Sequence, residues 1–277
     1  MNLRSMRPTD RDGAAALWLL TFGDSEAFTD WYFRERFDPV HSFAAFDGEA
    51  LIAMTLGRGT KIVAEGKTHD ALLISGVATR PEFRGRGLMH RLVRMQTEHA
   101  KNAGFACCYL HPVSESLYAA LGFETGTDAL LIASDADRTH EPLTLREGWD
   151  LSAMRTVYDA LLYTHDGMQL RDEAEWNALK SDYAADGFCS MIAEGEDHLA
   201  GYLCCLYDGT VAELFAHTAP VYAALLDAAA ARLNRPLQAI VPTDCGIAGE
   251  RVYSMQYRIF DDAFRLPLKN GFCRLSY

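Results

Sequence analysis

Blocks of hydrophobic and polar positions alternate along the first half of the chain and predict alternating helices and strands. Residues 10–22 and 25–37 have the apolar spacing of helices, and Thr9 is a candidate N-cap for the first of them. Residues 70–79 form a continuous apolar run, which is typical of a buried central strand. Helical spacing returns over residues 88–102, before the helix stop at a glycine. This order predicts an α/β fold.

Shorter runs supply the other elements of the first half. Strands are predicted over residues 2–7, 42–47, 50–56, 59–65 and 105–110. A short helix is predicted over 114–121. The stretch 134–148 is polar and charged, and it predicts a boundary between two domains, 1–138 and 139–277.

The second half repeats part of this order of elements. Helices are predicted over residues 150–163, 171–184 and 220–233. Strands are predicted over residues 188–193, 199–207, 210–216, 237–242, 254–260 and 271–276. The shared order predicts that the two halves are structural repeats.

Composition narrows the classes of function. Of the 277 residues, 49% are hydrophobic and 23% are charged, which is normal for a folded globular protein. The formal net charge of −12 argues against a nucleic-acid partner and against docking on an anionic membrane, because both need a basic face. The same charge suits a cationic small molecule.

The seven cysteines predict neither a disulfide framework nor a metal site. Cys107 and Cys108 are adjacent within a predicted strand, as are Cys204 and Cys205, so each pair points to opposite faces. No Cys-x-x-Cys motif is present. We therefore expect reduced thiols, no bound metal and a cytoplasmic protein. The apolar run Ala14–Phe22 is expected to be a helix and not a secretory signal, because acidic residues precede it.

The segment Gly76–Met89, GVATRPEFRGRGLM, is the most informative part of the chain. A buried strand ends there, Pro81 breaks it, and a loop with two glycines and two arginines opens a helix. Glycines let a ligand approach the backbone, and the start of a helix presents N–H groups that suit phosphate. The segment therefore predicts a pyrophosphate-binding loop, and a purely structural strand-to-helix turn is the alternative.

This loop resembles the acetyl-CoA loop of the GNAT superfamily of N-acetyltransferases, whose pattern is Gln/Arg-x-x-Gly-x-Gly/Ala. The matching residues are Arg84, Gly85, Arg86, Gly87, Leu88 and Met89, and Met89 stands where the superfamily has a small residue. A second hallmark, Leu-Tyr-x-x-Leu-Gly-Phe, matches Leu117–Phe123. Where the superfamily usually has Asn, seven residues before its tyrosine, this chain has His111.

More narrowly, the chain resembles the tandem-domain acetyltransferases of the "enhanced intracellular survival" type. The loop Arg84–Met89 fits their Arg-x-x-Gly-Leu-Leu/Met pattern, and the segments Gly167–Trp176 and Ala200–Tyr202 resemble their later regions. The resemblance implies tandem GNAT-like domains, each with a mixed, mostly antiparallel sheet flanked by helices. It also implies that the first domain is catalytic and the second degenerate. Longer members carry a sterol-carrier-like third domain, and we do not expect one within these 277 residues.

The implied chemistry is direct transfer of an acetyl group from acetyl-CoA to a primary amine of a small cationic acceptor. Such transfer needs an oxyanion donor, a base and an acid. The backbone around Val77 is the expected donor, and the resemblance assigns Tyr118 as the acid, with packing in the core as its alternative role. The resemblance also implies that Thr79 and Ser114 bind the cofactor together with the glycine-rich loop. The base stays open between a water chain, Glu115 and the terminal carboxylate of Tyr277.

Three aromatic residues of the second helix, Phe28, Trp31 and Tyr32, are predicted to line the acceptor pocket together with Glu115 and Tyr277. Their alternative role is core packing. Two other functions are kept open: a non-catalytic sensor that binds acyl-CoA, and a tRNA-dependent aminoacyl transferase. The acidic balance opposes the latter. A homo-oligomer is left open.

Overall fold

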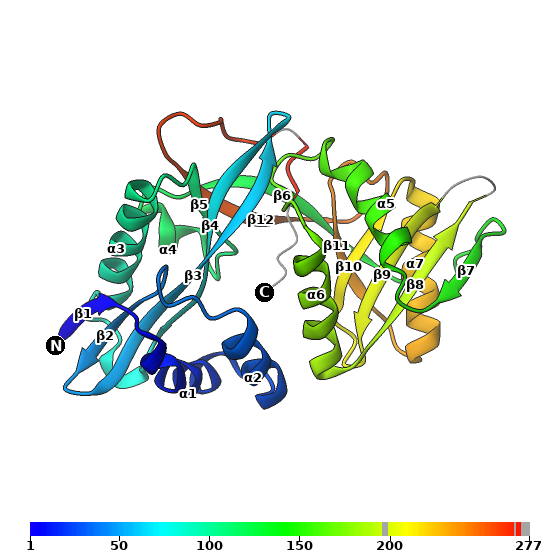
Figure 1. Cartoon of the computed structure of the whole chain (residues 1–277). Helices are drawn as coiled ribbons and strands as arrows, with labels where there is room; N and C mark the ends of the chain where they lie inside the picture. The colour runs from blue at the N-terminus through cyan, green and yellow to red at the C-terminus, as the bar shows by residue number, and fades with distance from the viewer. Residues whose placement is uncertain (196–198, 269, 273–277) are drawn as a thin grey trace.

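The computed structural model describes residues 1–195, 199–268 and 270–272 of the chain (Figure 1). The elements of the first half are β1 (Asn2–Ser5), η1 (Pro8–Asp10), α1 (Arg11–Phe22), α2 (Glu26–Glu35), β2 (Phe43–Asp47), β3 (Ala50–Ala64), β4 (Lys67–Thr79), η2 (Pro81–Phe83), α3 (Leu88–Asn102), β5 (Cys107–Leu110), α4 (Glu115–Ala119) and β6 (Glu124–Ala133). Those of the second half are β7 (Thr144–Glu147), α5 (Leu151–Leu162), α6 (Glu173–Asp186), β8 (Phe188–Glu194), β9 (Leu199–Leu206), β10 (Val211–Ala216), α7 (Ala219–Leu233), β11 (Gln238–Val241) and β12 (Glu250–Ile259).

The strands form two sheets with helices packed against them. The larger sheet has eight strands in the order β1-β2-β3-β4-β5-β12-β6-β11, and the smaller has four in the order β10-β9-β8-β7. Every neighbouring pair is antiparallel except β4 and β5, which are parallel. The predicted fold class, an α/β fold with mixed and mostly antiparallel sheets, is confirmed.

Strand β12 crosses from the end of the chain into the sheet of the first half. Its residues Gln256–Ile259 pair with β5, and its other edge pairs with β6 (Figure 1). The eight-stranded sheet therefore takes strands from both sides of residue 138. The division into a catalytic and a degenerate domain at that residue stays a prediction.

The structure departs from the predicted elements at several places. The strands predicted over 50–56 and 59–65 are one continuous strand, β3. Gly57 lies inside it because a side chain there would collide with the carbonyl of His41, so this glycine permits a close approach and makes no turn. Strands β6 and β7 were not predicted. The strand predicted over 271–276 falls mostly outside the described residues.

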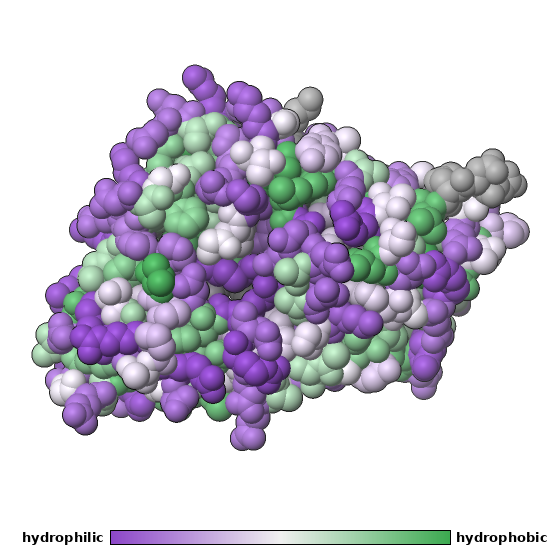
Figure 2. Space-filling model, in the orientation of Figure 1, coloured by the Kyte–Doolittle hydropathy of each residue, from purple (hydrophilic) through white to green (hydrophobic). Residues whose placement is uncertain are grey.

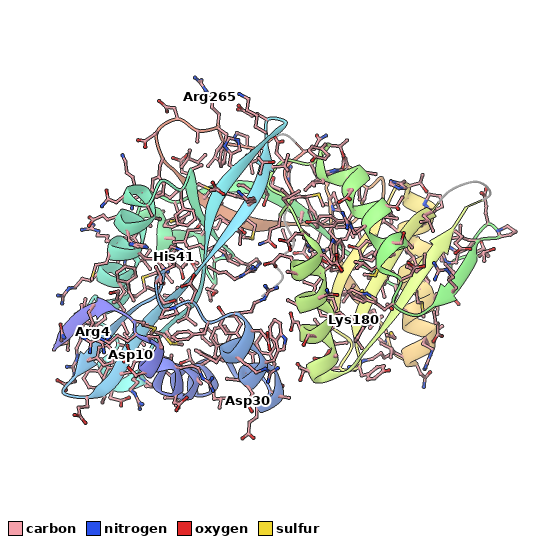
Figure 3. All side chains as sticks on the ribbon, viewed as in Figure 1. Arg4, Asp10, Asp30, His41, Lys180 and Arg265 are labelled. Atoms are coloured by element: carbon pink, nitrogen blue, oxygen red, sulfur yellow. The ribbon has the colours of Figure 1, made fainter. Side chains whose placement is uncertain are left out.

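The first two helices are bounded by local signals. Thr9 lies inside η1, and Asp10 stands at the N-cap of α1 instead; its carboxylate pairs with Arg4 of β1 at 2.7 Å (Figure 3). Gly23, with φ of 75°, ends α1. Ser25 then caps α2 by accepting a hydrogen bond from the backbone N–H of Phe28 at 2.9 Å. The short link between the two helices is thus fixed at both ends.

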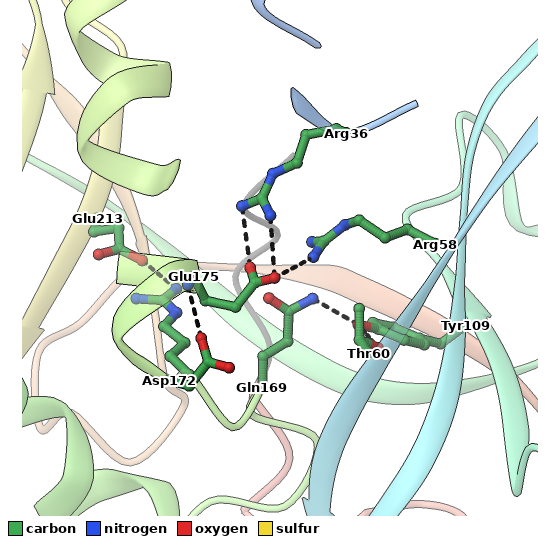
Figure 4. Close-up of polar contacts among 9 residues, drawn as sticks. Arg36, Arg58, Thr60, Tyr109, Gln169, Asp172, Glu175 and Glu213 are labelled. Atoms are coloured by element: carbon green, nitrogen blue, oxygen red, sulfur yellow. Dashed lines mark hydrogen bonds and ion pairs between the residues drawn. The ribbon is translucent and has the colours of Figure 1, made fainter. Parts of the chain in front are cut away.

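The two halves meet where α6 packs on α2. The Nε1 of Trp31 donates to Ser181 at 3.0 Å, and farther along the helices Glu175 binds both Arg36 and Arg58, each at 3.0 Å (Figure 4). Because these partners are largely buried, breaking the cluster leaves charges with poor solvation. The contact holds the second half against the helices that precede the central strands.

Hydrophilic residues cover most of the face shown in Figure 2, and hydrophobic ones are scattered over it in small patches. Over the described part of the chain, we find no helix with the length and apolar character of a membrane span.

Candidate active site

The centre of the site is the point where the two parallel strands separate. Residues Ala71–Leu73 of β4 pair with Cys107–Tyr109 of β5, and the pairing stops there. Strand β4 continues to Thr79 along its other neighbour, β3. Crevices at the carboxyl ends of parallel strands are common ligand sites, because backbone groups and side chains of both strands face the same space.

A β-bulge interrupts β4 just beyond this separation. Met54 of β3 pairs with Ala78, whereas Leu56 pairs with Ser75, so Gly76 and Val77 together face a single residue of β3. Gly76 has a φ of 51°, and a Cβ there would lie 2.7 Å from the ring of Trp18. Only glycine fits this conformation and this contact. The bulge turns backbone groups near Val77 out of the regular ladder.

A cavity of about 300 Å³ lies at this point. One wall comes from β4 and contains Ile74, Ser75, Gly76 and Val77. A second wall follows the end of β5 and reaches α4, with Leu110, His111, Val113 and Tyr118. The third wall comes from α1, α2 and the link between them, with Trp18, Phe22, Asp24 and Phe28. Residues that are almost a hundred positions apart therefore face one space.

Trp18 organises the wall formed by the helices. Its ring stacks on that of Tyr32 with centroids 4.7 Å apart, and its Nε1 donates to Asp24 Oδ2 at 2.7 Å. Tyr32 in turn shares a hydrogen bond with the hydroxyl of Ser75 at 2.8 Å. Burial raises the pKa of Tyr32, which keeps its hydroxyl neutral. One indole ring thus connects the bulge, the helix α2 and a carboxylate at the cavity.

Tyr118 lies in α4 with 5% of its surface exposed. Its ring packs against Phe123 and belongs to a cluster of buried side chains that includes Leu72 and Val93. Burial raises its pKa to about 12, so the hydroxyl keeps its proton at neutral pH. The two roles that the sequence offered for this tyrosine are compatible, because the ring packs in the core and also lines the cavity.

The glycine-rich loop runs from η2 to the start of α3. Gly85 and Gly87 have φ of 74° and 70°, and a Cβ on either would meet no atom within 4 Å. Gly87 is the N-cap of α3, and no side chain caps this helix start. The loop therefore leaves open space in front of unsatisfied helix N–H groups, which is the arrangement that phosphate-binding loops have.

The side chains of this loop differ in their exposure to solvent. Arg84 and Arg86 are exposed and donate to backbone carbonyls of the loop region, of Thr79 and Glu82 respectively. Leu88 is buried in a cluster beneath α3, so only its backbone remains for a ligand. Met89 is half-buried and packs toward the cluster that contains Tyr118.

The remaining predicted residues do not all lie at the cavity. Phe28 lines it, whereas Trp31 faces α6 and Tyr32 lies behind Ser75. Glu115 accepts a hydrogen bond from Thr125 at 2.8 Å and is absent from the lining. Ser114 is exposed at the start of α4, with its hydroxyl 3.1 Å from that of Ser116. Tyr277 lies outside the described residues.

The sequence did not point to Trp18, Asp24 or Ser75. Asp24 sits between the helix stop Gly23 and the N-cap Ser25, where an aspartate has an ordinary turn role. Ser75 is the one residue with a hydroxyl group between Ala71 and Gly76 in the apolar run of β4. This isolated hydroxyl is the only local feature that could have marked Ser75 as a site residue.

Among the described residues of the second half, the link from β10 to α7 does not repeat the glycine loop. Strand β10 leads through Thr218 directly into α7, whose first turn contains Pro220. Proline has no N–H to offer at a helix start. The ligand-binding geometry therefore belongs to the first half.

Comparisons with known proteins concern the fold and the first half of the sequence. Residues 2–126 match the profile of the acetyltransferase (GNAT) domain. A GCN5-related N-acetyltransferase from Anabaena variabilis has a similar structure, with a TM-score of 0.72 and 13% identity over 93% of this chain and 72% of that one. Eis1 from Mycobacterium abscessus gives a TM-score of 0.68 and 15% identity over 94% of this chain and 74% of that one. The expected likeness to the enhanced-intracellular-survival type is thus confirmed for the fold.

A more distant similarity is to Saccharomyces cerevisiae N-myristoyltransferase with bound myristoyl-CoA, with a TM-score of 0.60 and 9% identity over 94% of this chain and 82% of that one. No curated protein matches the sequence. Residues 2–126 therefore resemble the acetyltransferase (GNAT) domain in sequence, and nearly the whole chain shares the fold of solved N-acetyltransferases.

Proposed function

We propose that the protein transfers an acetyl group from acetyl-CoA to a primary amine of a small cationic acceptor. The observation that carries this proposal is the cavity at the separation of β4 and β5. Its walls bring together the bulge at Val77, the hydroxyl-bearing Tyr118 and the carboxylate of Asp24. These are the three kinds of group that direct acetyl transfer requires.

Acetyl-CoA is proposed to bind with its pyrophosphate at the loop Arg84–Gly87 and its thioester at the bulge. The open space in front of Gly85 and Gly87 supports this placement, since backbone N–H groups can approach phosphate oxygens there. Thr79, the last residue of β4, and Ser114, the N-cap of α4, are proposed to contact the cofactor between these two points. A cavity of about 300 Å³, shared between thioester and acceptor, favours a short acyl group over a fatty acyl chain.

In the proposed reaction, the amine nitrogen attacks the thioester carbonyl carbon. A C–N bond forms and the C–S bond breaks, while backbone N–H groups near Val77 stabilise the developing oxyanion. Asp24, the carboxylate in the described lining, holds the incoming ammonium and takes one proton from it, which leaves the neutral amine that attacks. Tyr118 gives its proton to the departing thiolate and regains one from the nitrogen, which loses its second proton once the C–N bond has formed. Glu115, whose carboxylate is engaged by Thr125, is a weaker base candidate than Asp24.

A reducing compartment is proposed for the protein. Among the described residues, the six cysteines are buried free thiols, which supports a cytoplasmic location. The described residues also contain no group of three or more side chains suited to a metal ion, and the proposed chemistry uses none. A homo-oligomer stays an open prediction.

The decisive test is steady release of free CoA thiol from acetyl-CoA in the presence of a panel of amines. Turnover with cationic amines, with an apparent KM that rises with salt, is the expected result because ion pairing with Asp24 is screened. If none of the amines in the panel causes release of the thiol, the result would instead support a non-catalytic acyl-CoA sensor.

A matched pair of variants sharpens this test. Asp24→Asn should lower kcat/KM by roughly 10²-fold or more, since it removes the proposed base. Asp30→Asn is the control, because Asp30 is exposed on α2 and points outward from the protein (Figure 3). Equal loss in the two variants would remove Asp24 from the mechanism.

A further inference from the structure

The lining of the cavity is unevenly divided between apolar and charged groups. Trp18, Phe22 and Phe28 give it three aromatic rings, and the strands add aliphatic side chains such as Ile74 and Val113. Lysine and arginine are absent from the described lining, and Asp24 is its one carboxylate. A ligand of matching chemistry has one positive charge and an apolar body.

The single carboxylate limits how many charges the ligand can bring. One oxygen of Asp24 already accepts from Trp18, and a carboxylate retains further acceptor sites for one ammonium group. The other polar side chains of the described lining, those of Ser75, His111 and Tyr118, carry no negative charge, so a second ammonium in this cavity would have no carboxylate to pair with. Asp182 and Asp186 of α6 lie outside the lining, and Asp186 accepts a hydrogen bond from Ser25. The geometry therefore disfavours polyamines.

The mouth of the cavity has apolar surface without a partner among the described residues. Phe22 is 40% exposed and Val113 is 87% exposed, although both line the cavity. The ring of Phe22 leans on Trp18 with centroids 4.7 Å apart, which holds it toward the space beside Asp24. An aromatic ring of a ligand would cover these two side chains, and such contacts are favourable beyond the area that they bury.

We propose that the acceptor is a primary arylalkyl monoamine, whose ammonium binds Asp24 and whose ring covers Phe22 and Val113. This assignment rests on the proposed acetyl transfer and specifies its substrate class. The reaction is the one given above: the ammonium loses one proton to Asp24, the nitrogen gains the acetyl group and loses its second proton to Tyr118, and CoA leaves as the thiol that Tyr118 has protonated.

The first experiment compares three amines as acceptors in the thiol-release assay. They are 2-phenylethylamine, butylamine as a chain without the ring, and spermidine as a polycation. We expect kcat/KM for 2-phenylethylamine to exceed the other two by roughly ten-fold or more. Equal or better turnover of spermidine would overturn the proposed substrate class and leave acetyl transfer standing.

The second experiment uses two variants on α1. Phe22→Ala should lower kcat/KM for 2-phenylethylamine by a larger factor than kcat/KM for butylamine, and so remove most of the preference between the two amines. Leu20→Ala is the matched control, because Leu20 is 56% exposed on the same helix and does not line the cavity. If Phe22→Ala keeps the full preference, the ring does not bind at this mouth and the proposal is wrong.

Calorimetry separates the site from the reaction. The proposed site is supported if 2-phenylethylamine binds more tightly than spermidine and if its binding weakens at least ten-fold in Asp24→Asn. If this binding is seen but no thiol is released, acetyl transfer alone is overturned. Absence of such binding together with turnover of other amines would overturn the arylalkylamine assignment alone.

Discussion

The hydroxyl groups of Tyr32 and Ser75 lie 2.8 Å apart in a buried hydrogen bond that joins α2 to β4. Ser75 directly precedes the bulge at Gly76, so this bond fixes the strand where the proposed oxyanion donors begin. It also connects the wall formed by the helices to the wall formed by β4.

Removing one partner of this bond should destabilise the protein. Tyr32→Phe leaves the Ser75 hydroxyl buried without its partner, and we expect unfolding free energy to fall by about 1–2 kcal/mol. The double variant with Ser75→Ala should lose less than the sum of the two single variants, because they share one interaction. Denaturant unfolding of the four proteins measures this coupling, and strictly additive losses would contradict it.

Gly87→Glu should strongly weaken acetyl-CoA binding. The change puts a negative charge at the open N-cap of α3, where the pyrophosphate is proposed to bind. Gly87→Ala is the matched control, since it imposes the same backbone strain at a φ of 70° without the charge. Calorimetry should show a loss of roughly 10²-fold or more for Glu and a much smaller one for Ala, with similar thermal stability. Unchanged binding in Gly87→Glu would place the pyrophosphate elsewhere.

Tyr118→Phe should lower kcat by roughly 10²–10⁴-fold with little change in acetyl-CoA affinity, because the ring stays and only the proton donor is lost. A pKa of about 12 keeps the hydroxyl protonated well above neutral pH, so Tyr118 should give no alkaline decline of the wild-type rate below about pH 11. Single-turnover measurements are required, since slow product release would hide the loss.

Tyr163→Phe is the control for this substitution, because Tyr163 is 64% exposed in the second half. A Tyr118→Phe enzyme with wild-type single-turnover rates across pH would assign this tyrosine to packing alone.

Asp182 should make stability depend on pH. Burial in α6 raises its pKa from 3.8 to about 7, and the nearby Arg36 offsets only part of this effect. Between these values the folded protein holds a proton that the unfolded chain releases, so stability falls as pH rises through this window and levels off above it. The loss is at most roughly 4 kcal/mol.

Asp182→Asn removes this titration. The variant should match the wild type near pH 4 and be more stable than it at pH 8, as measured by urea unfolding at both values. The exposed Asp30→Asn should show no such difference. A variant that is less stable than the wild type at pH 8 would mean that the ionised carboxylate stabilises the fold.

Strand β6 shows why part of the fold was not predictable. Its first residues, Glu124–Asp128, are polar and contain a glycine, so they have the composition of a loop. Gly126 is needed because the ring of Tyr257 from β12 lies against it, and a side chain there would collide with that ring. The reason for the glycine therefore lies 131 positions away in the sequence.

The sequence by itself determined the central strand β4, the glycine-rich loop, helix α3 and the segment Leu117–Phe123. Each of these depends on periodicity, helix stops or turn residues within a few positions, and such signals are local. The tertiary structure decided that β12 lies between β5 and β6, because alternation shows that a strand has two faces but not which strand lies beside it.

The tertiary structure also decided which side chains share the cavity. Trp18 and Asp24 line the same cavity as Tyr118 because α1 packs against β4 at the bulge glycine. Helical spacing predicts that Trp18 is on the buried face of α1, but it does not say what this face covers. The site is thus built from locally encoded elements, and its chemistry arises where packing brings their ends together.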